Sequence, residues 1–332
     1  MTALHRRVAL RLLGGALAAA QAGACLPAVA QTPAFPSKPI RLVVTFPAGG
    51  SSDMAARIVA PKLAERLGQA VVVDNKPGAG GGLGLDLVAK SPADGYTLVL
   101  ASAGGLTANP TLYKKLAYNP ARDFAPISLF GTSPFVLVAN AALPANSAKE
   151  LVALARAQAG KLSYASGGNG TAMHLSGELL KSMTQTFIVH IPYRGSAPAV
   201  LAVMGGETQL AIADIASIQP QLKSGRLKVI GVMGKQRSDL APEMPTLAES
   251  GVPGFDASGW FAVLAPAGTP PAVVQRLNTE LVAVLKTAEV RERFATAGLE
   301  PLTSSPDELA QLMKTETVKW AKVIHDSGAK VD

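Results

Sequence analysis

The sequence predicts an α/β protein with two lobes, each a mainly parallel sheet flanked by helices. Strand-like and helix-like segments alternate between Ile40 and about Ser102, an order that places parallel strands in one sheet with helices on its faces. A second alternating unit begins after the apolar run 135–139. Strand-like runs end near Leu264 and only helical patterns follow, so we expect the last helices to pack back on the first sheet.

This order of elements makes the first lobe discontinuous. We predict that residues 33–132 and 256–332 form the first lobe and residues 133–255 the second, after a leader of residues 1–30. The chain would then cross between the lobes twice. Without the leader, 302 residues remain (332 minus 30), which is long enough for two hydrophobic cores.

Each element of the first unit has its own signal. Residues 40–46 are β-branched and mostly apolar, as in a buried parallel strand. From Ser52 on, apolar residues recur at helical spacing until Gly68, which ends the helix. The remaining predicted elements are a strand at 70–74, a short helix ending near Lys90 and a strand at 96–101.

The second unit and the C-terminal part follow the same logic. Helices are predicted at 147–159, at 171–183 and from about 197, alternating with strands at 161–165, 186–190, 209–213 and 227–233. One more apolar strand is predicted at 260–264, followed by helices at 271–285, 290–297 and 305–324.

The first thirty residues have the layout of a secretory signal. Arginines come first, the segment from Leu12 to Ala24 is apolar, and Ala28-Val-Ala30 is a small-residue cleavage site. We therefore expect export and cleavage after Ala30. Arg6-Arg7 leaves the twin-arginine and general export routes both open, and lipidation of Cys25 is a further open alternative.

Composition argues against a nucleic-acid binder. The formal net charge is +8 and falls to +5 when the three arginines of the leader are removed. The basic residues are scattered and only 5% of residues are aromatic, whereas nucleic-acid binders gather Lys and Arg on one face. Cleavage would also remove the only cysteine, so the exported protein would have no disulfide.

The turn between the first strand and the first helix is the first candidate ligand site. Backbone N–H groups at a helix N-terminus attract carboxylates or phosphates. The candidate residues are Phe46, Ala48, Gly49, Gly50, Ser51 and Asp53. Asp53 also suits the helix dipole and would repel an anion if it pointed inward, and Ser52 is equally a helix cap. A β-branched residue at Gly50 is expected to block the ligand and to forbid any positive φ that the turn needs.

A second turn of the same kind follows the predicted strand at 161–165. Its candidates are Ser166, Gly167, Gly168, Asn169 and Thr171. Two such turns about a domain apart suggest one ligand held from both sides. Ser102 is a further candidate, because it stands at the carboxyl end of a predicted strand, where ligands sit in open α/β sheets.

Charged and ring side chains near these turns have two interpretations each. His174 either contacts the ligand or braces the second turn, and Asp214 either accepts from a ligand ammonium or caps a helix. Arg194 is a better carboxylate clamp than Arg57, which lies more than a turn into its helix.

Signatures of enzymes and cofactor sites are missing from the sequence. There is no Gly-x-Ser-x-Gly, His-Glu-x-x-His or paired Cys-x-x-Cys, and no Walker lysine follows a glycine loop. The glycine cluster at 78–84 fails Gly-x-Gly-x-x-Gly because Leu83 takes the place of the third glycine. We therefore expect no catalytic residue, metal or cofactor.

Six motifs in order resemble those of the tripartite tricarboxylate transporter receptors, also called Bug receptors. They are the segments 46–53, 74–81, 166–171 with His174, 190–195, 245–251 and 265–270. The resemblance implies a two-lobed periplasmic binding protein of the type II-like flytrap kind, whose ligand is a small di- or tricarboxylate, aromatic acid or amino acid. It implies that the first turn holds the carboxylate with help from Ser102 and Ala103, and that the second turn closes over it.

The expected protein is therefore a monomeric, periplasmic solute-binding receptor that serves a membrane permease. Two alternatives from other classes stay open. One is a secreted hydrolase or isomerase on the same scaffold, and the other is a sensor partner that presents its ligand to a signalling protein.

Overall fold

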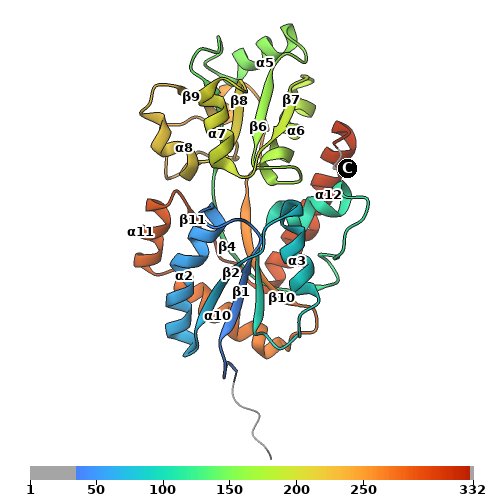
Figure 1. Cartoon of the computed structure of the whole chain (residues 1–332), viewed down its shortest axis with the longest axis vertical. Coiled ribbons are helices and arrows are strands. Elements are labelled where there is room, and N and C mark those ends of the chain that lie inside the picture. The colour runs from blue at the N-terminus through green and yellow to red at the C-terminus, as the bar shows by residue number, and fades with distance from the viewer. Residues whose placement is uncertain (1–34, 330–332) are drawn as a thin grey trace, which may run out of the picture. The chain divides into compact units, whose positions relative to one another are not determined.

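The computed structural model describes residues 35–329, and from Lys38 on the chain forms one compact unit. The predicted leader, with Cys25 and the Ala30 cleavage position, lies outside the described residues. The unit contains a six-stranded and a five-stranded sheet, and we call each sheet with its helices a lobe. Figure 1 shows the first lobe below and the second above.

The first lobe is built on the sheet β11-β4-β10-β3-β1-β2. Its parallel part is β1 (Ile40–Val44), β2 (Val71–Asn75) and β3 (Thr97–Ser102), as the apolar runs predict. Its antiparallel part is β4 (Phe124–Thr132), β10 (Trp260–Pro266) and β11 (Glu300–Pro301). The sheet is therefore mixed rather than mainly parallel.

The second lobe is built on the sheet β7-β6-β8-β5-β9. Strands β6 (Ser163–Ser166), β7 (Val189–Pro192) and β8 (Leu210–Asp214) run parallel. Strands β5 (Phe135–Asn140) and β9 (Leu227–Val232) join them antiparallel. The α/β two-lobed prediction is confirmed, with the correction that antiparallel strands complete both sheets.

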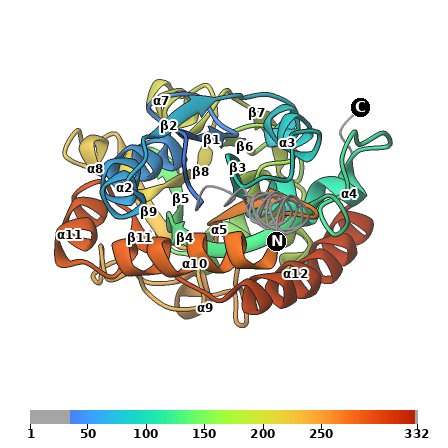
Figure 2. The same ribbon diagram turned by 90° about the horizontal axis from the view of Figure 1, so that it is seen from below.

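Helices cover both sheets. Those of the first lobe are α2 (Ser51–Leu67), α3 (Gly82–Ala89), α4 (Asn109–Leu112), α10 (Pro271–Leu285), α11 (Ala288–Thr296) and α12 (Pro306–Ser327), with short helical turns η1 (Ala79–Gly81) and η2 (Gly104–Ala108). Those of the second are α5 (Ala148–Ala157), α6 (Ala172–Thr184), α7 (Ser196–Gly205), α8 (Ile215–Leu222) and α9 (Leu247–Ser250). Seen from below, α10 and α12 lie on the side where β4 runs (Figure 2).

The C-terminal helices do pack back on the first sheet, but α12 also reaches the second lobe. It contacts β4 and η2 in the first lobe and α6 in the second. Trp320, Val323 and Ile324 are buried in the same cluster as Tyr164 and Leu175 of the second lobe. The chain also passes directly between the sheets at Ser133-Pro134, and again between β9 and β10. The cavity described next lies beside these connections.

Candidate functional site

A cavity of about 240 Å³ is lined by residues of both lobes. Nine of the predicted site residues line it, namely Phe46, Ala48, Gly49, Gly50, Ser51, Ser102, Gly167, Thr171 and Asp214. The sequence-based candidates did not include Pro47, Ser133, Phe135, Ala172, Met173, Gly195, Ser196, Ala197, Pro198, Ser217 and Phe261, and Ser52 was equally interpreted as a cap. The cavity thus brings together the two glycine-rich turns, as the sequence suggested.

Helix α2 begins at the cavity without a side-chain cap. Its N-cap is Gly50, whose backbone is extended (φ −80°, ψ 168°). The N–H groups of Ser51, Ser52 and Asp53 are the first three of the helix and have no carbonyl four residues before them inside it. No acceptor for them is found among residues 35–329. Because Ser51 and Ser52 line the cavity, these donors and the positive end of the helix dipole are available to an anion there.

Asp53 does not line the cavity, which corrects its place among the candidates. Its Oδ2 accepts from the Gly49 N–H at 2.9 Å, and Arg57 Nε donates to both carboxylate oxygens at 3.0 Å. Asn75 Nδ2 donates to Oδ1 at 2.9 Å. Burial alone would raise the pKa of Asp53, but these hydrogen bonds outweigh it and lower the pKa below its ordinary value. Asp53 is therefore an ionised brace for the turn.

The residue of this turn with a positive φ is Gly49, at 81°, and not Gly50. A Cβ on Gly50 would meet only the Pro47 carbonyl oxygen, at 3.4 Å. A β-branched residue at Gly50 would therefore meet no demand for a positive φ, because the turn reverses one residue earlier.

Two serine hydroxyls lie buried in the wall of the cavity without a protein partner. Ser102 ends β3, and Ser133 lies in the connection between β4 and β5; they are 7% and 1% exposed. Within the described residues, neither Oγ has a hydrogen-bond partner. Buried hydroxyls are nearly always hydrogen-bonded, so both are suited to a polar group in the cavity.

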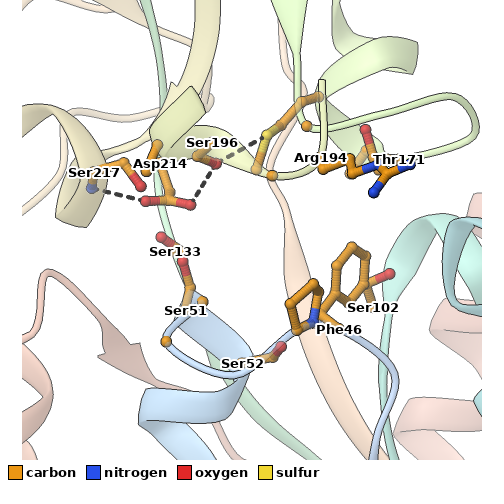
Figure 3. A pocket seen from close by; sticks show the side chains of 18 of the residues that line it. Phe46, Ser51, Ser52, Ser102, Ser133, Thr171, Arg194, Ser196, Asp214 and Ser217 are labelled. Carbon is orange, nitrogen blue, oxygen red and sulfur yellow. Dashed lines mark hydrogen bonds between the residues drawn. The ribbon is translucent and has the colours of Figure 1, made fainter. Parts of the chain in front are cut away.

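Three helices of the second lobe also begin at the cavity. Thr171 caps α6, with its Oγ1 accepting from the His174 N–H at 3.3 Å. Asp214 caps α8 by accepting from the Ser217 N–H at 2.9 Å, and its other oxygen accepts from Ser196 Oγ at 2.7 Å (Figure 3). Helix α7 starts at Ser196, and its N-cap Gly195 has no side chain, which leaves the amides of Ser196 and Ala197 as donors.

Arg194 lines the cavity from the second lobe (Figure 3). It is exposed, and among the described residues its guanidinium makes no hydrogen bond or ion pair. Arg57, by contrast, is bound to Asp53 and to Asn75 Oδ1 and does not line the cavity. Of the two arginines considered as a carboxylate clamp, only Arg194 can therefore contact a ligand in the cavity.

Five further candidates lie behind the cavity wall. Ala103 is buried where η2 begins, and Ser166 Oγ lies 2.6 Å from His190 Nε2. His174 is buried and its Nδ1 accepts from the Gly170 N–H at 3.2 Å, which favours its brace interpretation. Gly168 and Asn169 complete the turn without lining the cavity.

Glycines of the first lobe let the second lobe's turn approach closely. A Cβ on Gly104 would lie 2.7 Å from the Gly170 carbonyl oxygen, and one on Gly80 would lie 3.3 Å from that of Asn169. The glycine cluster at 78–84, which matched no nucleotide motif, therefore has a packing role at the contact between lobes.

The remaining walls are apolar. Phe46, Phe135, Phe261, Met173 and Pro198 line the cavity beside the polar groups. Among residues 35–329 there is no group of three or more His, Cys, Asp or Glu side chains that could hold a metal ion. In the same part of the chain, no helix combines the length and the apolar character needed to cross a membrane.

Comparison with known proteins identifies the family. Residues 55–329 match the model of the tripartite tricarboxylate transporter family receptor. BugT of Bordetella pertussis is 39% identical over 313 residues, covering 94% of this chain and 95% of BugT.

Solved structures agree. The R. palustris protein Rpa4515 with adipate has a TM-score of 0.82 at 36% identity, covering 89% of this chain and 98% of that one. MatC from Rhodopseudomonas palustris with bound malate has a TM-score of 0.79 at 32% identity, covering 87% of this chain and 100% of MatC. The periplasmic binding protein BugD has a TM-score of 0.80 at 36% identity, covering 89% of this chain and 99% of BugD. The protein therefore belongs to the tripartite tricarboxylate transporter receptors, the family that includes the Bug proteins.

Proposed function

We propose that this receptor binds a small carboxylate in the cavity between its lobes and delivers it to a membrane permease. The observation that carries the proposal is the convergence of unpaired donors on one cavity. These are the first amides of α2 and α7, the hydroxyls of Ser102 and Ser133, and the guanidinium of Arg194. Similar proteins with adipate and with malate support the same ligand class.

The carboxylate is expected to lie at the start of α2. Each charge-assisted hydrogen bond from a backbone amide is worth about 1.5–3 kcal/mol when its loss would leave a buried group unpaired. The helix dipole adds to this attraction. The amides of α2 thus bind the carboxylate from the side of the first lobe, and the amides of α7 contact the ligand from the side of the second lobe.

Asp214 sets the orientation of the ligand. Its buried carboxylate lines the cavity and would repel a second carboxylate placed against it. A ligand is therefore expected to turn its anionic end toward α2 and to bring a hydroxyl, an ammonium or an apolar group near Asp214.

The cellular setting follows from the family. The extracytoplasmic location of its members supports export of this chain, with the leader cleaved after Ala30 and the predicted lobe boundaries retained in a monomeric mature protein. We further propose that the receptor releases its ligand chemically unchanged. The alternative of an enzyme on this scaffold has no observation in its favour among the described residues.

Calorimetry tests the proposal. Adipate and malate are titrated into the mature protein, beside the uncharged adipamide, and each mixture is then analysed by mass spectrometry. We expect at least one carboxylate to bind, adipamide not to bind, and no turnover. Native mass spectrometry of freshly purified protein extends the search to any retained carboxylate. Binding of adipamide as tight as that of adipate, or conversion of a bound acid, would overturn the proposal.

A further inference from the structure

Behind the second glycine-rich turn, two histidine rings are stacked. The ring centroids of His174 and His190 lie 4.0 Å apart with an interplanar angle of 17°. His174 comes from the first turn of α6 and His190 from β7, and neither lines the cavity. The rings therefore contact the turn outside the cavity.

The hydrogen bonds of His174 fix its tautomer. Nδ1 accepts from the Gly170 N–H at 3.2 Å, so Nδ1 carries no proton and Nε2 does. Nε2 faces Glu178 Oε1 at 3.9 Å, too long for a hydrogen bond. Glu178 is instead held by Lys181 Nζ at 2.8 Å, so this pair, not a charged histidine, balances the carboxylate.

His190 also acts as an acceptor. Ser166 Oγ lies 2.6 Å from His190 Nε2 and accepts from the Gly168 N–H at 3.2 Å. The other possible acceptor for the Ser166 hydroxyl is the Gly168 carbonyl oxygen, which lies farther from Ser166 Oγ, at 3.3 Å. The geometry thus best fits a Ser166 hydroxyl that donates to His190 Nε2, so that this nitrogen carries no proton and the ring is neutral.

Each residue that a ring holds is followed directly by a residue that lines the cavity. Ser166 and Gly170 are bound by His190 and His174, and the next residue in each case, Gly167 or Thr171, lines the cavity. Fixing two points of a short turn also fixes the backbone between and beside them.

We propose that His174 and His190 are positioning residues, which in their neutral forms hold the 166–171 turn in the shape that presents Gly167 and Thr171 to the ligand. Protonation of His174 would place an N–H against the Gly170 N–H and release it. Protonation of His190 is better tolerated, because the Ser166 hydroxyl can rotate to the Gly168 carbonyl. The consequence for ligand affinity rests on the function proposed above, whereas the effect on the turn does not.

Burial, more than the surrounding titratable groups, favours neutral rings. Those nearest are Tyr164, Glu178 and Lys181, and Tyr113 lies beyond Gly170. Tyr164 donates to Glu178 Oε1 at 2.8 Å and to the His174 carbonyl at 3.0 Å. Burial lowers the pKa of His174, with Glu178 opposing and Lys181 adding to the shift. Burial, His174 and Lys181 together lower the pKa of His190 to about 3.

The test measures the turn itself in the full mature protein, without ligand. Nitrogen-15 NMR of the wild-type imidazoles should show His174 Nδ1 and His190 Nε2 unprotonated at pH 7. A protonated Nδ1 on His174 would overturn the proposal without any variant.

Amide exchange at Gly170 is then compared between His174→Leu, which removes the acceptor, and His174→Asn, which keeps an acceptor near Nδ1.

We expect the Gly170 amide to exchange about tenfold faster in His174→Leu than in the wild type, because the loss of one net hydrogen bond corresponds to about that factor. In His174→Asn its exchange rate should stay close to that of the wild type. Equal exchange in all three proteins would also overturn the proposal. Adipate is titrated as a separate arm at pH 7, where His174→Leu should bind it more weakly than the wild type and His174→Asn do. If the turn responds as expected but adipate does not bind, the ligand assignment fails and the positioning role stands.

Discussion

Asp53 accepts a hydrogen bond from the backbone N–H of Gly49 at 2.9 Å, and this contact has a counterpart in the other lobe. There, His174 accepts from the N–H of Gly170 at 3.2 Å. In both turns the acceptor lies four residues after the glycine, at the third position of the following helix, and the glycine has a positive φ of 81° or 74°. Each lobe thus uses the first turn of a helix to shape the turn that precedes it.

The position of the left-handed residue gives the first prediction. Gly49→Ala should reduce the free energy of unfolding by about 1–2 kcal/mol, because a Cβ disfavours a positive φ even where space is free. Gly50→Ala is the matched control, since φ is −80° there. Urea unfolding followed by circular dichroism measures both, and equal losses would contradict the assignment of strain to Gly49.

The ionised state of Asp53 gives a pH prediction. Its pKa is lower in the folded protein than the ordinary value of 3.8, so the carboxylate stabilises the fold above that value and the contribution is lost as the pH falls through the folded-state pKa. Asp53→Asn keeps an acceptor for Gly49 but loses the charge that faces Arg57. We expect the variant to be less stable than wild type at pH 7 and the difference to shrink below pH 4. A difference that stays constant from pH 7 to pH 3 would show that the charge is unimportant.

The buried serines should separate binding from stability. Ser102→Ala and Ser133→Ala each remove a hydroxyl without a protein partner, so thermal stability should stay the same or rise. Affinity for the bound carboxylate should fall about fivefold, or about 1 kcal/mol. Ser128→Ala is the control, because Ser128 Oγ accepts from the Ser304 N–H at 3.1 Å and its loss should affect stability alone. Serine variants that lose stability while binding normally would contradict the proposed roles.

Contact between the lobes at Gly104 gives the next prediction. A Cβ there would lie 2.7 Å from the Gly170 carbonyl oxygen, so Gly104→Ala should push the two turns apart and weaken carboxylate binding about tenfold or more. Gly205→Ala in α7 is the control, because nothing lies within 4 Å of its Cβ. Calorimetry compares the two after a check that each is folded. Unchanged affinity in Gly104→Ala would show that binding does not need this approach.

The sequence predicted the parallel strands and their helices because continuous β-branched runs and helical spacing are local signals. Strand β4 was missed because Pro126, Ser128 and Gly131 break its apolar pattern, and its pairing with β10 shifts register twice. The cavity-facing turns could be found for the same local reason. Ser133 could not, because it reaches the cavity through the connection that follows the missed strand. Phe261 stands in a predicted strand, but the pairing that places it opposite Ser102 at the cavity is not visible in the residue order.

Side-chain direction was a further limit. Asp53 and His174 stand in the right segments, but whether a side chain faces the ligand or its own turn depends on hydrogen bonds that the residue order does not reveal. The sequence left both interpretations of His174 open, and the geometry favours the brace.

The central claim is that helix N-termini of both lobes hold the carboxylate. Amide NMR shifts of Ser51, Ser52 and Ala197 during a titration with adipate, or with whichever carboxylate is retained on purification, test it most directly. We predict that all three shift together and saturate at the calorimetric stoichiometry, and that the uncharged diamide moves none of them. Saturable binding that leaves these three amides unchanged and disappears in Arg194→Ala would contradict the claim, because the carboxylate would then be held by the arginine.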